Sequence, residues 1–166
     1  MGSLNHRDSK AKICVYTALF GDYDNLTDPV VSFEGCDFIC FTDQTNLKSD
    51  IWDIRIVDNC DAPAHMMNRK YKLLPHIYLS EYQISLYIDA NISLIDSPYQ
   101  QVQELLAHSN FCIPKHAWRE CIYDEAIECV ALGRAKFREV RKQMVRYHKE
   151  GFPRKFGLGE NNILIR

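Results

Sequence analysis

The chain has 166 residues, a formal net charge of −2 and 46% hydrophobic residues. This size fits one domain, and the composition excludes a mainly disordered, collagen-like or coiled-coil chain and gives no general pull toward nucleic acid. No apolar run approaches the ~18 residues that cross a bilayer, and residues 1–12 lack the apolar stretch of a secretory signal, so we expect a cytoplasmic protein without a transmembrane segment.

The first third of the chain predicts β-structure behind a polar arm. Residues 1–11 are mostly polar and are expected to form a flexible N-terminal arm. Residues 12–19 and 37–43 are apolar and rich in strand-forming side chains, which is typical of buried strands. Residues 51–57 alternate between apolar and polar side chains, which indicates a third strand at a sheet edge.

The next segment changes to a helical period. Apolar side chains recur at helical spacing over residues 62–82, so we expect a helix with one apolar face. Pro75 lies inside this run and predicts a kink or a split into two helices. Residues 84–89 then predict a central strand.

Residues 97–100 predict the start of a helix. Ser97 is a candidate N-cap, Pro98 suits the first helical position, and Gln100 is placed to close a capping box. We expect this helix to bury Val102, Leu105 and Leu106.

The last third predicts two helices between two short strands. Residues 111–113 and 162–166 are the expected strands, and residues 120–132 and 135–149 are the expected helices, separated near Gly133. Strands that alternate with helices indicate an α/β fold in which a mixed, mostly parallel sheet has helices on both faces. In such a sheet, ligands bind at the carboxyl ends of the strands.

Asp89 and Asn91 close the predicted central strand. Residues two apart in an extended chain face the same side, so these two side chains are candidate ligands for a hard divalent cation. An aspartate that caps the next turn, followed by an ordinary turn asparagine, explains the same spacing. On spacing alone, the turn explanation is the stronger one.

Arg69 and Lys72 form a second candidate site. They lie three residues apart and therefore share one side of the predicted helix. An arginine fork and a lysine point charge together suit a diphosphate. Without further context, a solvated cationic helix face explains the pair better.

Polar and aromatic side chains gather after the strand predicted over residues 111–113. Trp118 is a candidate plate for a sugar ring, His116 and Arg119 are candidate binding groups, and Glu125 is a candidate base. The competing interpretation is a helix start with acidic first-turn residues and a hydrogen-bonded histidine.

The seven cysteines predict reduced, mostly buried thiols, because their number is odd and no export signal is visible. A minor alternative is structural zinc, since Cys36 and Cys40, and Cys112 and His116, have tolerable ligand spacing. The motifs of common dinucleotide, P-loop, esterase and zincin proteins are absent from the sequence.

Taken together, these segments resemble the glycosyltransferase-like domain of the plant TOD and MUCI proteins and their bacterial relatives. The order and spacing of many short pieces carry the resemblance, whereas no single piece would. The matching pieces are residues 12–21, Phe41-Thr-Asp43, residues 69–76, residues 85–91, His116 with residues 119–126, and Gly151-Phe-Pro153 with Gly157-Leu158.

The resemblance implies a GT-A fold, which is Rossmann-like, a nucleoside-diphosphate sugar donor, and Mn²⁺ or Mg²⁺ as cofactor. Asp89 and Asn91 then occupy the place of the metal-binding D-x-D motif, in a D-x-N variant with less negative charge. The metal would neutralise charge on the departing diphosphate.

The same resemblance implies roles for other residues. Tyr16, Thr17 and Ala18 would line the nucleobase and ribose, with Asp43 near them. Arg69 and Lys72 would face the diphosphate or the donor sugar. His116, Arg119 and Glu125 would border the sugar and the acceptor.

We therefore expect residues 12–166 to form one glycosyltransferase domain, shortened at its C-terminus relative to the family. The predicted activity is metal-dependent transfer of a sugar to an unknown acceptor, with Asp89 and Glu125 as catalytic candidates, Glu125 as a base only if the reaction inverts the anomeric centre. The alternative is a non-catalytic module that keeps the fold and binds a saccharide or a partner protein.

Overall fold

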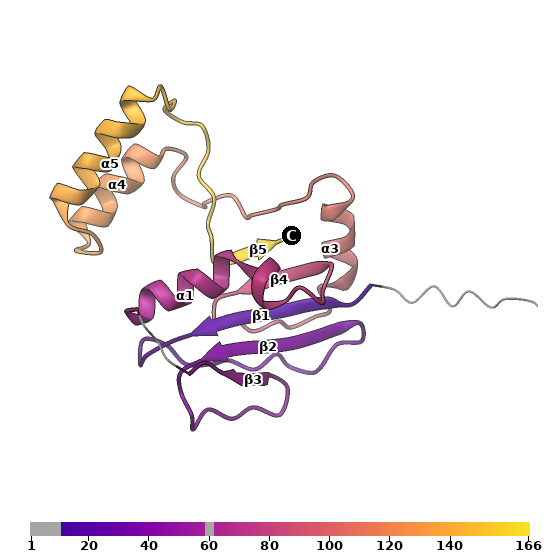
Figure 1. Cartoon of the computed structure of the whole chain (residues 1–166). Helices are drawn as coiled ribbons and strands as arrows, with labels where there is room; N and C mark the ends of the chain where they lie inside the picture. The colour runs from indigo at the N-terminus through magenta and orange to yellow at the C-terminus, as the bar shows by residue number, and fades with distance from the viewer. Residues whose placement is uncertain (1–10, 59–61) are drawn as a thin grey trace, which may run out of the picture. The chain divides into compact units, whose positions relative to one another are not determined.

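The computed structural model describes residues 11–58 and 62–166, so the predicted arm lies almost entirely outside the described residues. These residues divide into two compact units, labelled by element in Figure 1. The first unit comprises the described residues up to Cys112 together with Asn162–Arg166, and the second comprises Ile113–Asn161. Among the described residues, no helix has both the length and the apolar character to span a membrane.

The first unit is built on a five-stranded sheet with the order β3-β2-β1-β4-β5. The first four strands are parallel, and β5 runs antiparallel to β4. This confirms the α/β class and the mixed, mostly parallel sheet, with the third predicted strand at an edge. The strands are β1 (Ile13–Leu19), β2 (Cys36–Thr42), β3 (Asp53–Ile56), β4 (Ile84–Ile88) and β5 (Ile163–Ile165).

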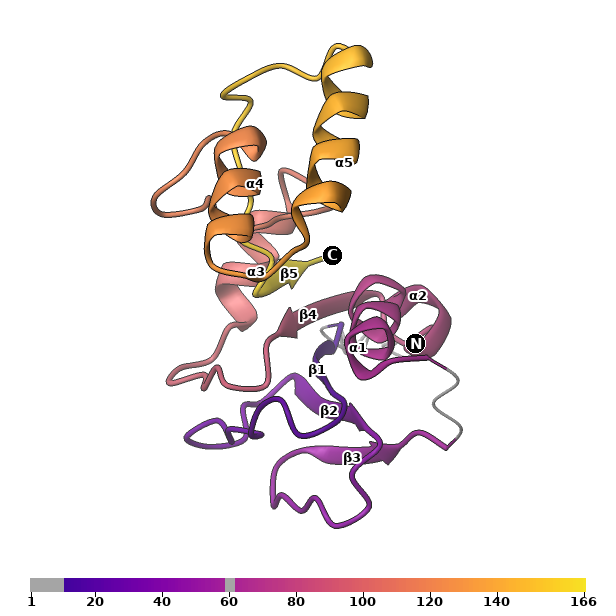
Figure 2. The ribbon, with the colours of Figure 1, turned by 90° about the vertical axis from the view of Figure 1, so that its left-hand side faces the viewer.

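Helices cover both faces of this sheet. Helices α1 (Ala64–Leu73) and α2 (Pro75–Tyr78) lie together on one face (Figure 2), and α3 (Tyr99–Leu106) packs on the other. Alternate residues of β1 serve the two faces, so that Tyr16 joins the cluster around α1 and Val15 joins the cluster that contains Val102 of α3. Burying one such large apolar side chain stabilises the fold by about 1.5–3 kcal/mol.

Pro75 divides the long helical segment as the sequence predicted. Helix α1 ends at Leu73, and Pro75 occupies the first turn of α2, where its missing N–H costs nothing. Leu74 between them has a φ of −120° and leaves the helical conformation, as expected for a residue before proline. The split turns the end of α1 toward the strand edge, where Lys72 is buried.

Several expectations for residues 97–113 were wrong. Pro98 rather than Ser97 takes the N-cap position of α3, whose first helical residue is Tyr99, and no side chain caps this helix. Gln100 closes no capping box, because the Ser97 N–H donates to the Asp96 carboxylate at 2.7 Å instead, and Leu105 is 46% exposed rather than buried. Residues 111–113 form no strand, and only Cys112 makes a single bridge, to Ile165. Since β5 has only three residues, it offers a further strand little length to pair with.

The second unit contains two helices, α4 (Ile122–Ala131) and α5 (Phe137–Lys149), close to the predicted ranges. Gly133 between them has a φ of +67°, which a glycine adopts without strain. The two ends of the unit pair with each other, since Lys115 bridges Gly159 and the N–H of His116 donates to the carbonyl of Leu158 at 2.7 Å.

Candidate functional site

The carboxyl ends of β1 and β4 mark the place where the strand order reverses. From β1 the chain passes to β2 and β3 on one side and later returns to β4 on the other side. Open α/β sheets bind ligands at such a switch point. Asp89 follows β4 directly there, and Gly21 lies just beyond the end of β1.

Asp89 is held by two donors from its own unit. Its Oδ1 accepts hydrogen bonds from the Lys72 ammonium at 3.0 Å and from the Tyr87 hydroxyl at 2.8 Å. The Asp89 side chain is 37% exposed, whereas that of Lys72 is only 9% exposed. Burial and the neighbouring Asp89 charge both raise the pKa of Tyr87, so its hydroxyl stays protonated and keeps donating.

The buried ammonium of Lys72 is positioned by its surroundings. It lies 4.4 Å from the centre of the Tyr87 ring, a cation–π distance. Its backbone carbonyl accepts hydrogen bonds from the Tyr16 hydroxyl at 2.8 Å and from the Arg166 guanidinium at 3.3 Å. Both the side chain and the backbone of Lys72 are therefore fixed beside Asp89.

Asn162 is a site residue that sequence reasoning missed. The register of β4 and β5 pairs Ile88 with Ile163, and the Asp89 N–H donates to the Asn162 carbonyl at 2.9 Å. Opposite residues of an antiparallel pair place their side chains on the same face. Within the described ranges, the buried Asn162 Oδ1 has no hydrogen-bond partner. Only the pairing of residues 162–166 with the central strand could have revealed it.

Asn91 does not continue the strand beyond Asp89. The Ile92 N–H donates to the Asp89 carbonyl at 2.9 Å, which closes a turn over residues 89–92. The extended-chain premise for the Asp89 and Asn91 pair was therefore wrong, because the chain bends immediately after the strand. The Asn91 side chain is exposed.

The donor chemistry of this cluster suits a hard cation of limited affinity. Asp89 Oδ2 accepts no hydrogen bond within the described part of the chain, and Asn162, the antiparallel partner of Asp89, carries a neutral side-chain oxygen without a hydrogen-bond partner there. The described residues contain no group of three or more His, Cys, Asp or Glu placed to hold a metal. Because Lys72 already balances the one carboxylate, a divalent cation fits here only with additional anionic ligands.

The loop after β1 is latched to neighbouring elements. Asp43, which follows β2, accepts the N–H of Gly21 at 3.0 Å, and the Gln44 amide donates to the Gly21 carbonyl at 2.6 Å. The Asn68 amide donates to the Ala18 carbonyl. Gly21 has a φ of +66°, and an added Cβ would lie 3.2 Å from that of Ala64, so glycine suits this turn.

The three residues expected to line a nucleobase are in the core. The side chains of Tyr16, Thr17 and Ala18 are almost completely buried, and Thr17 Oγ1 has no hydrogen-bond partner among the described residues. The accessible part of this edge is the loop that Asp43 latches. A nucleotide role for the three residues stays a prediction.

Arg69 and Lys72 differ in their surroundings, and their joint role toward a diphosphate stays a prediction. Arg69 is exposed, whereas Lys72 is buried against Asp89. They share a side of α1 in sequence spacing, but the short helix ends beside the sheet, so only Lys72 is drawn into the protein.

The second unit brings His116, Arg119 and Glu125 together. The Arg119 Nε donates to the Glu125 carboxylate, and His116 Nε2 lies 3.8 Å from the same oxygen. Burial raises the pKa of Glu125, but hydrogen bonds from Arg119 and Cys129 and the nearby positive charges outweigh it, so the pKa is lowered overall. A carboxylate of lowered pKa is a weaker proton acceptor. Nearby, Trp118 is 86% exposed, as a sugar-stacking plate requires.

Comparison with known sequences finds a family model that covers most of the chain. The family described as "TOD1/MUCI70, glycosyltransferase-like domain" matches residues 4–161. No curated protein and no solved structure matches the chain.

Proposed function

Because the chain belongs to the TOD1/MUCI70, glycosyltransferase-like domain family, we propose that it transfers a sugar from a nucleoside-diphosphate sugar to an acceptor, assisted by Mn²⁺ or Mg²⁺ at Asp89. The observation that carries this proposal is the position of Asp89. It is a partly exposed carboxylate at the strand-order switch of a parallel sheet, beside a buried ammonium.

The residues around Asp89 have complementary tasks in this proposal. Asp89, Asn91 and Asn162 would hold the cation, which supplies charge neutralisation on the departing diphosphate. Lys72 keeps a fixed positive charge near the same phosphates, since it is anchored through its carbonyl and through the Tyr87 ring. Exposed Arg69, one turn earlier on α1, is free to follow the donor.

Other predicted roles depend on the same proposal. The loop held by Asp43 would meet the base and ribose, and Trp118, His116 and Arg119 would meet the sugar or acceptor. Glu125 in its present ion pair with Arg119 favours charge stabilisation over proton abstraction, because its pKa is lowered. Base catalysis by Glu125 would require Arg119 to move away.

Isothermal titration calorimetry with UDP and GDP, each with and without Mn²⁺, tests the proposal. We expect one nucleotide to bind in a Mn²⁺-dependent way and Asp89→Asn to weaken that binding at least about tenfold. Since Asn91 is exposed, Asn91→Asp adds a second carboxylate without disturbing the core and should strengthen Mn²⁺ binding.

Asn110→Asp is the matched control, because it makes the same charge change at another exposed position of the first unit. It should leave binding unchanged. No nucleotide binding at millimolar concentration, or equal effects of the Asn91 and Asn110 variants, would refute the proposal.

A non-catalytic binding module is the second candidate. It is favoured by the single carboxylate of the site, which Lys72 already neutralises. Release of diphosphate from a panel of nucleotide sugars by the purified chain would reject this candidate. Nucleotide or saccharide binding without any release would favour it.

A further inference from the structure

The second unit carries a concentrated positive charge that the whole-chain balance conceals. Residues 134–155 contain nine Lys or Arg and only two Glu, although the full chain has a net charge of −2. Helix α5 has no fully buried residue. Its apolar side chains Val140, Met144 and Tyr147 are half-buried, and its Lys and Arg side chains are exposed beside them.

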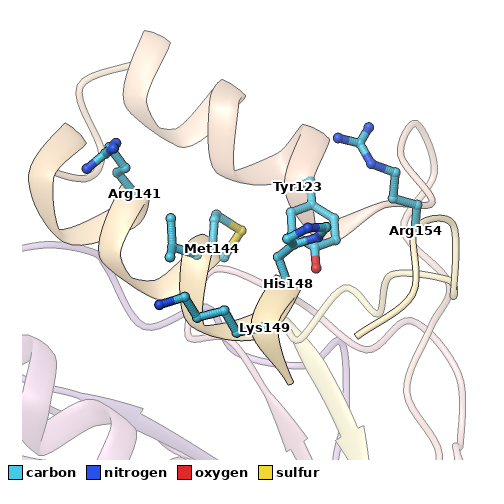
Figure 3. Close-up of a pocket in the computed structure, with 7 residues that line it drawn as sticks. Tyr123, Arg141, Met144, His148, Lys149 and Arg154 are labelled. Atoms are coloured by element: carbon cyan, nitrogen blue, oxygen red, sulfur yellow. The ribbon is translucent and has the colours of Figure 1, made fainter. Parts of the chain in front are cut away.

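Three of these cations border a groove between α4, α5 and the loop that follows (Figure 3). The groove has a volume of about 380 Å³, within the usual range for ligand sites. Its principal lining residues are Tyr123 from α4, Arg141, Met144, His148 and Lys149 from α5, and Arg154 from the loop.

The groove combines an aromatic and apolar wall with available charge. The Tyr123 hydroxyl donates to the Phe152 carbonyl at 2.9 Å, which fixes the ring, and the Arg154 guanidinium lies 5.5 Å from the ring centre. In the described ranges, no carboxylate forms an ion pair with Arg141, Lys149 or Arg154. By contrast, Arg146 on the same helix pairs with Glu150 at 3.5 Å.

The spacing of the charges selects an extended ligand. Arg141 and Lys149 lie eight residues apart on α5, which is about 12 Å along the helix axis. A ligand that carries several anionic groups along a chain contacts both without the two side chains bending toward each other, and its faces can pack on Tyr123 and Met144.

We propose that this groove binds an acidic saccharide chain, whose charged groups pair with Arg141, Lys149 and Arg154 while a sugar ring packs on Tyr123. As the acceptor of a sugar transfer, this ligand rests on the proposed function.

Calorimetry of the intact chain, without nucleotide or metal, tests the groove. The probes are a carboxylated alginate oligomer and a neutral dextran oligomer of equal length. Alginate should bind, more weakly as salt is raised, and dextran should not. We expect Arg141→Gln and Lys149→Gln each to weaken alginate binding about fivefold.

Arg146→Gln is the matched control, since it makes the same charge change on the same helix outside the groove. It should change alginate affinity by less than about twofold, and circular dichroism should show equal helix content in all variants. Equal losses of alginate affinity in Arg141→Gln and Arg146→Gln would overturn the proposed saccharide site. Binding of dextran as tightly as alginate would also overturn it.

Polyphosphate and anionic lipid vesicles separate a saccharide site from a general polyanion surface. If either binds as tightly as alginate, the saccharide assignment is wrong. If alginate fails to bind while Mn²⁺-dependent nucleotide binding is intact, this inference fails alone. If alginate binds but no nucleotide does, the groove is still a saccharide-binding site, but it is no longer assigned as the acceptor site of a sugar transfer.

Discussion

At the scale of single residues, the pair formed by Lys72 and Asp89 is the most demanding interaction of the first unit. Removing an ammonium from water is costly, and its ion pair and the Tyr87 ring offset that cost here. Such a pair is weak evidence for stability by itself. In the proposed function, its position at the strand-order switch places the positive charge where the phosphates of the donor would bind.

Substituting Asp89 and substituting Lys72 should therefore lower the free energy of unfolding by different amounts. Asp89→Asn leaves a lysine that is 9% exposed without its counter-charge, whereas Lys72→Met leaves a carboxylate that is 37% exposed. We expect free-energy losses of about 3 and about 1 kcal/mol, respectively, from urea unfolding. The opposite order would show that the ammonium is better solvated than its burial indicates.

The stability of the folded state should depend on pH through Asp37, and the contacts of this side chain determine the direction of that dependence. Hydrogen bonds from Lys12 at 2.8 Å and Tyr82 at 2.9 Å lower its pKa below the ordinary 3.8, against an opposing contribution from burial. The folded state then holds its proton less tightly than the unfolded state, so this contribution to stability exists above the unfolded pKa and disappears as pH falls through the folded pKa.

Asp37→Asn should consequently flatten the fall in unfolding midpoint between about pH 5 and pH 2. Urea titrations at several pH values measure this. Asp96→Asn, at an exposed position of the same unit, is the comparison variant. If both variants keep the wild-type slope, the hydrogen bonds to Asp37 do not contribute to acid stability.

At the scale of elements, the sequence predicted those strands and helix ends that depend on residues close together in the chain. The apolar runs of β1, β2 and β4 and the break at Pro75 were correctly predicted, because they depend on side chains within a few residues. The isolated bridge at Cys112 depends on how little of β5 is available for pairing, and the placement of Asn162 depends on its antiparallel partner. Neither is encoded in a short window of sequence.

The candidate site divides along the same line. Asp89 was predicted correctly at a strand end, but its contact with Lys72 joins residues 17 positions apart through the way α1 ends. The turn at Asn91 replaced an extended chain, since the Ile92 N–H found the Asp89 carbonyl.

The connection before β2 supplies a test at this scale. Gly35 and Gly151 both have a φ of +78°, but only at Gly35 would a new Cβ lie 3.0 Å from the Tyr99 ring. The Tyr99 hydroxyl donates to the Ala11 carbonyl at 3.2 Å, which restrains the ring.

We expect Gly151→Ala to lower the free energy of unfolding by about 1 kcal/mol through backbone strain, and Gly35→Ala to lower it by about 2 kcal/mol or more. Urea unfolding followed by circular dichroism measures both. Equal losses would mean that the Tyr99 ring moves aside at no cost.

At the scale of the whole molecule, the chain leaves the first unit after Cys112 and returns to it at Asn162 to form β5. The sheet unit has two buried apolar clusters, whereas α5 of the second unit has no fully buried residue. Stability should therefore be distributed unevenly along the chain.

Hydrogen exchange followed by mass spectrometry measures this distribution. The backbone amides of β1 and β4 should exchange with deuterium about tenfold or more slowly than those of α5. Equal protection of β1 and α5 would show that the two units open in one cooperative step.

The most direct test of the central claim is anomalous diffraction from crystals of this chain soaked with Mn²⁺ and UDP. The account predicts an anomalous peak within about 2.6 Å of an Asp89 carboxylate oxygen, with the diphosphate on the same ion and Lys72 nearby. A nucleotide bound elsewhere, or an Asp89 carboxylate that contacts only Lys72 and Tyr87 in the soaked crystal, would contradict it.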